Sequence, residues 1–201
     1  CASLVVGGAS QTPAVTSPAG SRIIGVKTIT SNGTGGGNWN SAASWQGSIP
    51  PTSNDHVVIQ SGDAINLAAN ASCIDLTSSG QLNLNSYELA ISGNLKLTGA
   101  CNINSTCNSR LVINDFGYKD QLIIPSGITM LQKITMNRLT GALCDLDLHL
   151  DDCVPADSVV CVFNLGPLVM GNGKKVFMNS LAIQADIPTN DSSYVDGIVS
   201  R

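Results

Sequence analysis

Carboxylates that could take part in catalysis or bind a cation gather in one short stretch of the sequence, CDLDLHLDDC, at residues 144–153. Leucines alternate with polar residues there, and in a strand this alternation places Asp145, Asp147, His149 and Asp151 on one face. Such a face can bind Ca²⁺ through several carboxylate oxygens, or supply the acid and the base of a polysaccharide-cleaving enzyme. The alternative, which we favour, is a solvated strand face, because no Lys or Arg lies in this strand to meet an acidic sugar.

The rest of the sequence offers little that a catalytic mechanism could use. His56 and His149 lie far apart, and neither has a serine or cysteine partner in a nucleophile motif. None of the seven cysteines forms a CxxC pair or stands near a histidine at the spacing of zinc ligands. We therefore expect a protein that is not an enzyme and that holds neither a metal nor another cofactor.

Six of the seven cysteines form an even set that can make three disulfides, which would require an oxidising compartment outside the cytoplasm. Cys101 and Cys107 are the first pair to expect, because their separation of six residues matches the spacing of the short apolar segments around them. The alternative for several of these side chains is a buried thiol, since free cysteine is among the most buried residue types. The disulfide candidates are Cys73, Cys101, Cys107, Cys144, Cys153 and Cys161.

Cys1 is the odd cysteine. A Cys at the start of the chain, followed by the small residues Ala2 and Ser3, is typical of a processed bacterial lipoprotein and predicts a lipid anchor. The alternatives are that the chain begins here for another reason, or that Cys1 pairs with another chain.

Composition excludes some classes of partner. Only 12% of the residues are charged, the net charge is −4, and the ten Lys and Arg are scattered, whereas nucleic-acid binding needs clustered basic residues. No apolar run reaches the roughly 18 residues of a transmembrane helix. Ser, Thr, Asn and Gly take the place of charge, which favours tight turns and a neutral surface rich in hydrogen-bonding groups.

Short apolar segments separated by Gly, Asn and other small residues fill the stretch from Ser72 to Asp115. Leu84, Ile91, Leu97 and Ile103 follow one another at intervals of seven, six and six residues, too short for hairpins of ordinary strands with full loops. A solenoid of short strands fits this spacing. The pattern continues towards the C-terminus with longer gaps, and residues 168–185 predict two strands joined by a hairpin-like GNGKK turn. The predicted fold is all-β, a β-solenoid of the parallel β-helix kind, with very little helix.

The two ends of this fold have different compositions. Residues 1–26, which include Pro13 and Pro18, predict an arm or linker, and residues 27–201 form the predicted β-solenoid domain. Two apolar runs near the N-terminus, Ala2–Val6 and Arg22–Ile29, can fold back on their own domain, which is the default, or donate a strand to a neighbouring copy.

Residues 31–55 predict a cap. A solenoid exposes its apolar core at its open end, and Trp39 and Trp45 lie in a glycine-rich loop that can cover it. Asp55 can accept N–H groups of the Pro-Pro turn before it. The alternative is that the two tryptophans form a platform on which sugars stack.

The cap residues also carry a family resemblance. Trp39, Trp45, Pro50 and Asp55, with the following strand Val57-Val58-Ile59 and Gly62, resemble the opening of parallel β-helix-like modules in large secreted and surface proteins of Bacteroidetes, which are often exported by the type IX secretion route. The segments 73–76 and 193–201 are similar to the inner strands and the closing sequence of those modules. The resemblance covers residues 28–201 and implies an extracellular, adhesin-like module. It also makes Ser158, in Asp157-Ser158-Val159, a candidate for O-glycosylation.

These features predict a non-catalytic structural or adhesive module at the cell surface that can assemble with copies of itself into a filament. The alternative is a carbohydrate-binding or carbohydrate-cleaving β-helix. That alternative requires Trp39, Trp45 and the face from Asp145 to Asp151 to be exposed in one groove. The expected partners are therefore other copies of the chain and surface glycans.

Overall fold

The computed structural model describes residues 25–99, 102–106, 108–115, 122–124, 133–145, 147–150, 161–178, 195–196 and 198–200. These residues form short β-strands and two single-turn 3₁₀ helices, so the predicted all-β class with little helix is confirmed. The helices are η1 (Ala42–Ser44) and η2 (Gln46–Ser48). The strands are β1 (Thr28–Thr30), β2 (Gly36–Asn38), β3 (His56–Ile59), β4 (Ala64–Asn66), β5 (Ala71–Cys73), β6 (Leu76–Ser78), β7 (Gln81–Asn83), β8 (Glu88–Ile91), β9 (Leu95–Leu97), β10 (Ile103–Asn104), β11 (Arg110–Asn114), β12 (Leu122–Ile124), β13 (Lys133–Asn137), β14 (Ala142–Cys144), β15 (Leu148–Leu150), β16 (Cys161–Leu165), β17 (Leu168–Met170), β18 (Lys175–Met178), β19 (Val195–Asp196) and β20 (Ile198–Ser200).

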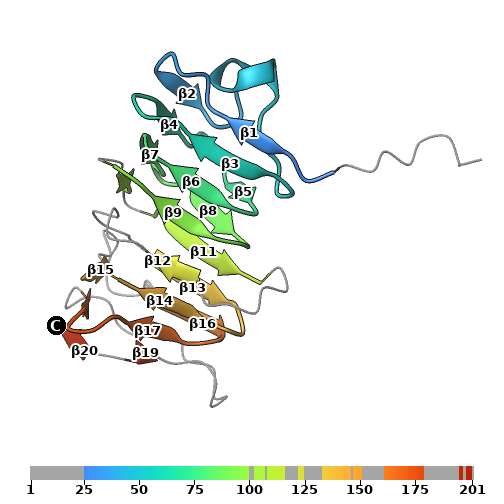
Figure 1. Ribbon diagram of the computed structural model, residues 1–201. Coiled ribbons are helices and arrows are strands. Elements are labelled where there is room, and N and C mark those ends of the chain that lie inside the picture. The colour runs from blue at the N-terminus through green and yellow to red at the C-terminus, as the bar shows by residue number, and fades with distance from the viewer. Residues whose placement is uncertain are drawn as a thin grey trace, which may run out of the picture.

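Strands that are neighbours in a sheet are never neighbours in the described sequence. From β3 to β11 the chain enters three sheets in strict rotation, so that every third strand returns to the same sheet. We call one such round of three strands a cycle. The sheet orders are β1-β3-β6-β9, β2-β4-β7-β10 and β5-β8-β11-β13-β16, with β12-β14-β17-β19 and β15-β18-β20 towards the C-terminus. Figure 1 shows the strands stacked in chain order, from blue β1 and β2 to red β20.

Every pairing between these strands is parallel, including the one between β3 and β6. The predicted hairpin at GNGKK is therefore wrong: β17 pairs with β14 and β19, whereas β18 pairs with β15 and β20. The turn is present, but the strands on either side of it enter different sheets. Among the described residues, no helix is long and apolar enough to cross a membrane.

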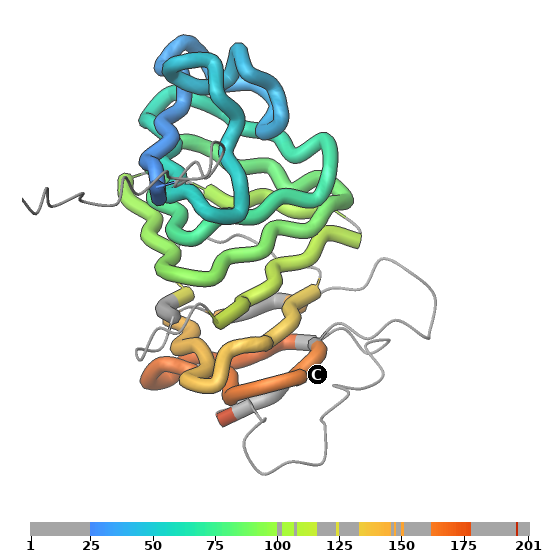
Figure 2. The backbone as a smooth tube through the Cα atoms, turned by 90° about the vertical axis from the view of Figure 1, so that its right-hand side faces the viewer, coloured from blue at the N-terminus to red at the C-terminus, as the bar shows by residue number. Residues whose placement is uncertain are grey.

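The core consists of side chains that lie directly above one another in successive cycles. Val57 pairs in register with Leu76, and Leu76 with Leu95, at steps of 19 residues. Strand alternation turns these positions inward, and each burial of a Leu or Ile contributes roughly 1.5–3 kcal/mol. The second and third sheets add Ile65, Leu82 and Ile103, and Cys73, Ile91 and Ile113, all no more than 1% exposed. Figure 2 shows the segments stacked around this interior.

Asparagines form two ladders that run along the stack. In one ladder the Asn83 amide donates to Asn66 Oδ1 (2.7 Å), and the Asn104 amide donates to Asn83 Oδ1 (2.9 Å). The other ladder, Asn114, Asn137 and Asn164, has the same direction, with distances of 2.9 and 2.7 Å. The side-chain N–H of each asparagine thus satisfies the side-chain oxygen of the asparagine before it in the ladder, as in other stacked parallel strands.

Glycine is required where the corners of successive cycles touch. A Cβ at Gly80 would overlap the backbone oxygens of Gln60 and Asp63 in the previous cycle. Gly166, at φ +81°, lies in the same way against the backbone oxygen of Arg138. These contacts let the turns stack at the spacing of the strands they join.

The N-terminal arm falls mostly outside the described residues, including Ala2–Val6. The end of the run Arg22–Ile29 forms part of β1, which pairs with β3 of its own domain. This docked strand is the default that the sequence predicts.

The asparagine ladder can be tested with Asn83→Ala, which removes both side-chain bonds at the middle rung. We expect a loss of about 1–2 kcal/mol in the free energy of unfolding, measured by denaturant titration. The matched control is Asn40→Ala, at an exposed position without a ladder partner. Equal stability of the two variants would show that the ladder contributes nothing.

Candidate functional site

The two tryptophans close the N-terminal end of the core. Trp39 and Trp45 are 4% and 2% exposed, and they belong to the same buried cluster as Ile29 and Val57. Their rings meet edge to face, with centroids 5.4 Å apart, and Trp45 Nε1 donates to the Trp39 carbonyl at 2.7 Å. A platform for sugars needs an exposed ring face, so the geometry agrees with the capping interpretation and not with stacking by these two residues.

Asp63 fastens the glycine-rich loop of the cap to the strands below. Its carboxylate accepts hydrogen bonds from the Ser31 hydroxyl and from the N–H groups of Gly33 and Gly35, both at 2.8 Å. Burial raises the pKa of Asp63, but the bonds from Ser31, Gly33 and Gly35 outweigh it, so that its pKa lies below the usual value. This side chain is only 2% exposed, and its donors belong to a loop about 30 residues earlier in the chain.

Sequence reasoning did not select Asp63 as a functional residue. The available signal was the glycine-rich loop itself, whose backbone N–H groups need an acceptor. The acceptor could not be identified without knowing which later turn stacks on that loop.

Asp55 holds the Pro-Pro turn, as its position suggested. One carboxylate oxygen, Oδ2, accepts the N–H of Thr52 at 2.8 Å and its hydroxyl at 2.7 Å. The other oxygen, Oδ1, is buried without a hydrogen-bond partner among the described residues. Asp55 is 3% exposed and thus belongs to the packed cap.

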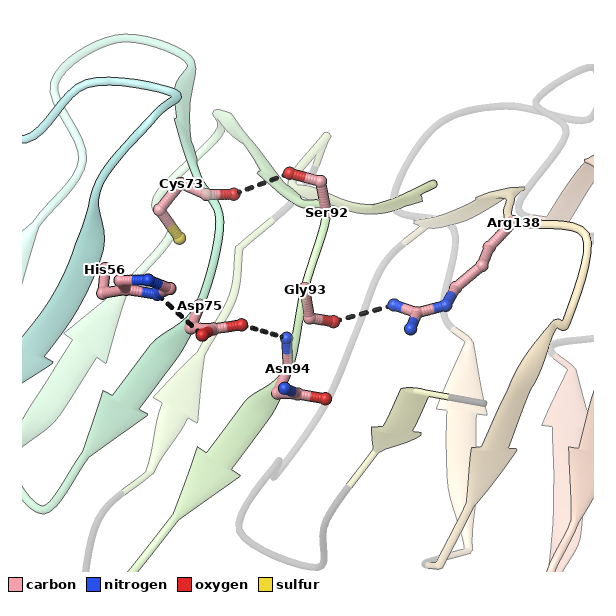
Figure 3. A network of polar contacts seen from close by, with 7 residues as sticks. All are labelled: His56, Cys73, Asp75, Ser92, Gly93, Asn94 and Arg138. Atoms are coloured by element: carbon pink, nitrogen blue, oxygen red, sulfur yellow. Dashed lines mark hydrogen bonds and ion pairs between the residues drawn. The ribbon is translucent and has the colours of Figure 1, made fainter. Parts of the chain in front are cut away.

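A histidine, an aspartate and a cysteine come together next to the cap, as Figure 3 shows. His56 Nδ1 lies 2.6 Å from Asp75 Oδ2, and the other oxygen of Asp75 accepts the N–H of Asn94 at 2.6 Å. Burial, together with the negative charge of Asp75, strongly raises the pKa of the Cys73 thiol. A nucleophilic cysteine needs the opposite, a lowered pKa and access to substrate. The cluster therefore links cycles and does not form a catalytic triad.

Arg138 extends this network across the stack. Its guanidinium is fully buried, donates from Nη1 to the Gly93 carbonyl at 2.8 Å, and contacts Thr140 through Nε at 3.2 Å. Gly93 and Arg138 are 45 residues apart in the sequence. Figure 3 shows the Arg138 side chain reaching towards the turn that precedes β9.

The acidic stretch is only partly described. Asp145 and Asp147 are exposed, and Asp147 Oδ1 accepts the Lys175 N–H at 2.9 Å, which ties β15 to β18. Asp151 and the side chain of His149 lie outside the description. No group of three potential metal ligands occurs within the described part, and the Ca²⁺ interpretation of Asp145, Asp147 and Asp151 stays a prediction.

The cysteines, like the acidic stretch, are only partly described. Cys73 is a free, buried cysteine, which corresponds to the buried-thiol alternative at this position, and Cys144 is likewise buried in the core. The backbone of Cys161 belongs to β16, but its side chain is not described. Outside the described residues lie Cys1, Cys101, Cys107, Cys153 and Ser158, so the disulfide, lipid and glycan predictions at these positions stay predictions.

Asp63 makes the stability of the cap depend on pH. Because its pKa is lower in the folded state, its contribution is complete above the unfolded pKa of about 3.9 and is lost as the pH falls through the folded value. We expect Asp63→Asn to destabilise the cap by about 1–3 kcal/mol at neutral pH, and by progressively less below about pH 4. Tryptophan fluorescence during denaturant unfolding measures this, since both tryptophans of the chain lie in the cap.

The control for this experiment is Asp196→Asn, which changes an exposed carboxylate far along the chain. A difference between Asp63→Asn and wild type that stays constant with pH would contradict an ionised Asp63 in the cap.

The hydrogen bonds described above join parts of the chain to one another, and comparison with known proteins adds no functional assignment. The chain matches no protein-family model, no curated protein and no solved structure.

Proposed function

We propose that this chain is a β-solenoid module with a structural role, in which stacked cycles form a rigid body for adhesion or for building an extracellular filament. The observation that carries the proposal is the rotation of the strands through three parallel sheets from β3 to β11. A cycle of three short strands cannot bury its own apolar side chains, so its stability comes from its neighbours. An object built in this way grows along one axis and presents a long lateral surface.

The use of the polar side chains supports a structural role. Asp63 and Asp147 each accept backbone N–H groups from another turn or strand, and Asp55 accepts the N–H of Thr52 within its own turn. The asparagine ladders and the buried Arg138 likewise connect successive cycles. These are groups that an enzyme would leave available to a substrate, and here they hold the backbone in place.

Composition supports a location outside the cytoplasm. With 12% charged residues and a net charge of −4, the chain relies on neutral Ser, Thr, Asn and Gly for its solvation. The resemblance to Bacteroidetes surface modules is consistent with this, and so is the surface rich in neutral hydrogen-bonding groups that this composition provides. Adhesion through a long, neutral surface is the function that fits these features together.

Self-assembly would use the free edge of β1. In its sheet β1 stands at the end of the order β1-β3-β6-β9 and has one ladder partner, β3, among the described strands. An antiparallel bridge between Ser31 and Trp45 closes the end of this edge, beyond Thr28–Thr30. An edge of this kind accepts an added strand, and the apolar run Ala2–Val6 of a second copy is the strand that we propose.

Deletion of residues 1–26 tests this arrangement. We expect wild-type protein to form regular fibres in negative-stain electron microscopy, and the deletion variant to elute as a monomer in size-exclusion chromatography with light scattering. Because β1 begins at Thr28, the variant should keep the far-ultraviolet circular dichroism of the intact chain.

A matched variant, Val5→Asp with Val6→Asp, keeps the arm but places charges in the donor strand. It should also remain monomeric, because burying two unpaired carboxylates against a sheet edge is energetically unfavourable. Filaments that persist after the deletion would contradict strand donation, and a wild-type chain that stays monomeric at all concentrations would contradict assembly as its function.

A further inference from the structure

We propose that this protein binds a neutral, hydroxyl-rich chain, such as an oligosaccharide, in a pocket at one corner of the stack. The pocket has a volume of about 560 Å³ and is lined by three turns, Ser61–Ala64, Ser79–Gln81 and Thr98–Gly99. These turns join β3 to β4, β6 to β7 and β9 to β10, and so occupy the same corner in three consecutive cycles. We call this site the corner pocket. A binding site here goes beyond the structural role, and it does not depend on assembly.

The corner pocket contains a repeated pair of residues, a hydroxyl side chain followed by glycine. The pairs are Ser61-Gly62, Ser79-Gly80 and Thr98-Gly99, one in each turn. Ser79 and Thr98 directly follow Ser78 and Leu97, which pair in register, so their hydroxyls form a row with a spacing of about 4.8 Å along the stack. This spacing is close to the length of one sugar ring in an extended glycan, which lets two consecutive sugars meet equivalent groups. Ser61 lies in the longer turn between Ile59 and Ala64 and adds a third hydroxyl at a position without an equivalent in the next cycle.

Two of these hydroxyls are oriented by bonds to the cycle before them. Ser79 Oγ donates to the Ile59 carbonyl at 3.2 Å, and Thr98 Oγ1 donates to the Ser78 carbonyl at 3.4 Å. Since their protons are directed inward, their oxygens present lone pairs to the pocket and accept hydrogen bonds from a ligand. Sugar hydroxyls are suitable donors for this row.

Gln81 supplies the complementary groups. It is exposed at the wall of the corner pocket, and its side-chain amide makes no hydrogen bond within the described part of the chain. The amide offers both a donor and an acceptor, the combination that a sugar hydroxyl needs. Gly80 adds no side chain to the corner pocket, because a Cβ there would overlap the backbone oxygens of Gln60 and Asp63.

The charges around the corner pocket favour a neutral ligand. Asp63 is the single ionisable side chain among the lining residues, and its carboxylate is bound by Ser31, Gly33 and Gly35 of the cap loop. An acidic polymer would find no Lys or Arg in the lining to pair with it, and an apolar peptide would find few apolar side chains. The volume lies within the range of about 300–1,000 Å³ typical of small-ligand sites.

The test is a titration of the full chain with cellohexaose, with maltohexaose and with the acidic oligomer hexagalacturonate, followed by NMR and calorimetry. The double variant Ser61→Ala/Gln81→Ala removes two exposed polar groups of the corner pocket. The control Ser53→Ala/Gln46→Ala removes the same two residue types at exposed positions outside it. Because all four side chains are exposed, both variants should fold, and circular dichroism checks this.

We expect at least one neutral hexasaccharide to bind, with the pocket variant weakening binding about fivefold or more and the control leaving it unchanged. NMR shifts should concentrate in the three turns of the corner pocket. The proposal is overturned if neither neutral sugar binds, if hexagalacturonate binds more tightly than both, or if the two double variants bind equally well.

Discussion

The structure depends on the burial of aliphatic side chains that stack in register from one cycle to the next. Strands of two to five residues have too few hydrogen bonds and too little apolar surface to be stable alone. When Leu76 lies between Val57 and Leu95, each strand gains two neighbours that exclude water from both sides. The short strands therefore exist because the stack exists, and a change in one inner residue affects the cycles on either side.

The apolar core and the polar ladders together determine which register the stack adopts. A slip of one residue would turn every inner side chain outward, and the apolar core opposes this strongly. The asparagine ladders add a second constraint, because Asn83 meets both Asn66 and Asn104 only when the second sheet is in its observed register. Glycines such as Gly80 act by allowing close approach, so that the corners do not force the cycles apart.

The proposed functions use three different parts of this body. The cap with Trp39 and Trp45 closes one end of the core, and β1, at the end of its sheet, is the edge to which we propose that a second copy adds a strand. The lateral corner carries the hydroxyls of Ser61, Ser79 and Thr98, and its shape follows from the stacking of three turns of different lengths. In a stack of cycles, a residue type that recurs at the same register position becomes a linear array.

The sequence by itself determined the positions of many strands, the small helix content of the described residues and the position of the cap. Ile91, Leu97 and Ile103 lie in the successive strands β8, β9 and β10, and Leu84 directly follows β7, because alternation and turn residues are local signals. The tertiary structure decided which strands pair, so that the expected hairpin at GNGKK became a turn between two sheets. It also decided that Asp63 binds the loop at Gly33 and Gly35, and that Arg138 reaches Gly93 across 45 residues. These contacts join residues one or more cycles apart, and a periodic sequence does not specify which distant turn will lie against which until the chain has stacked.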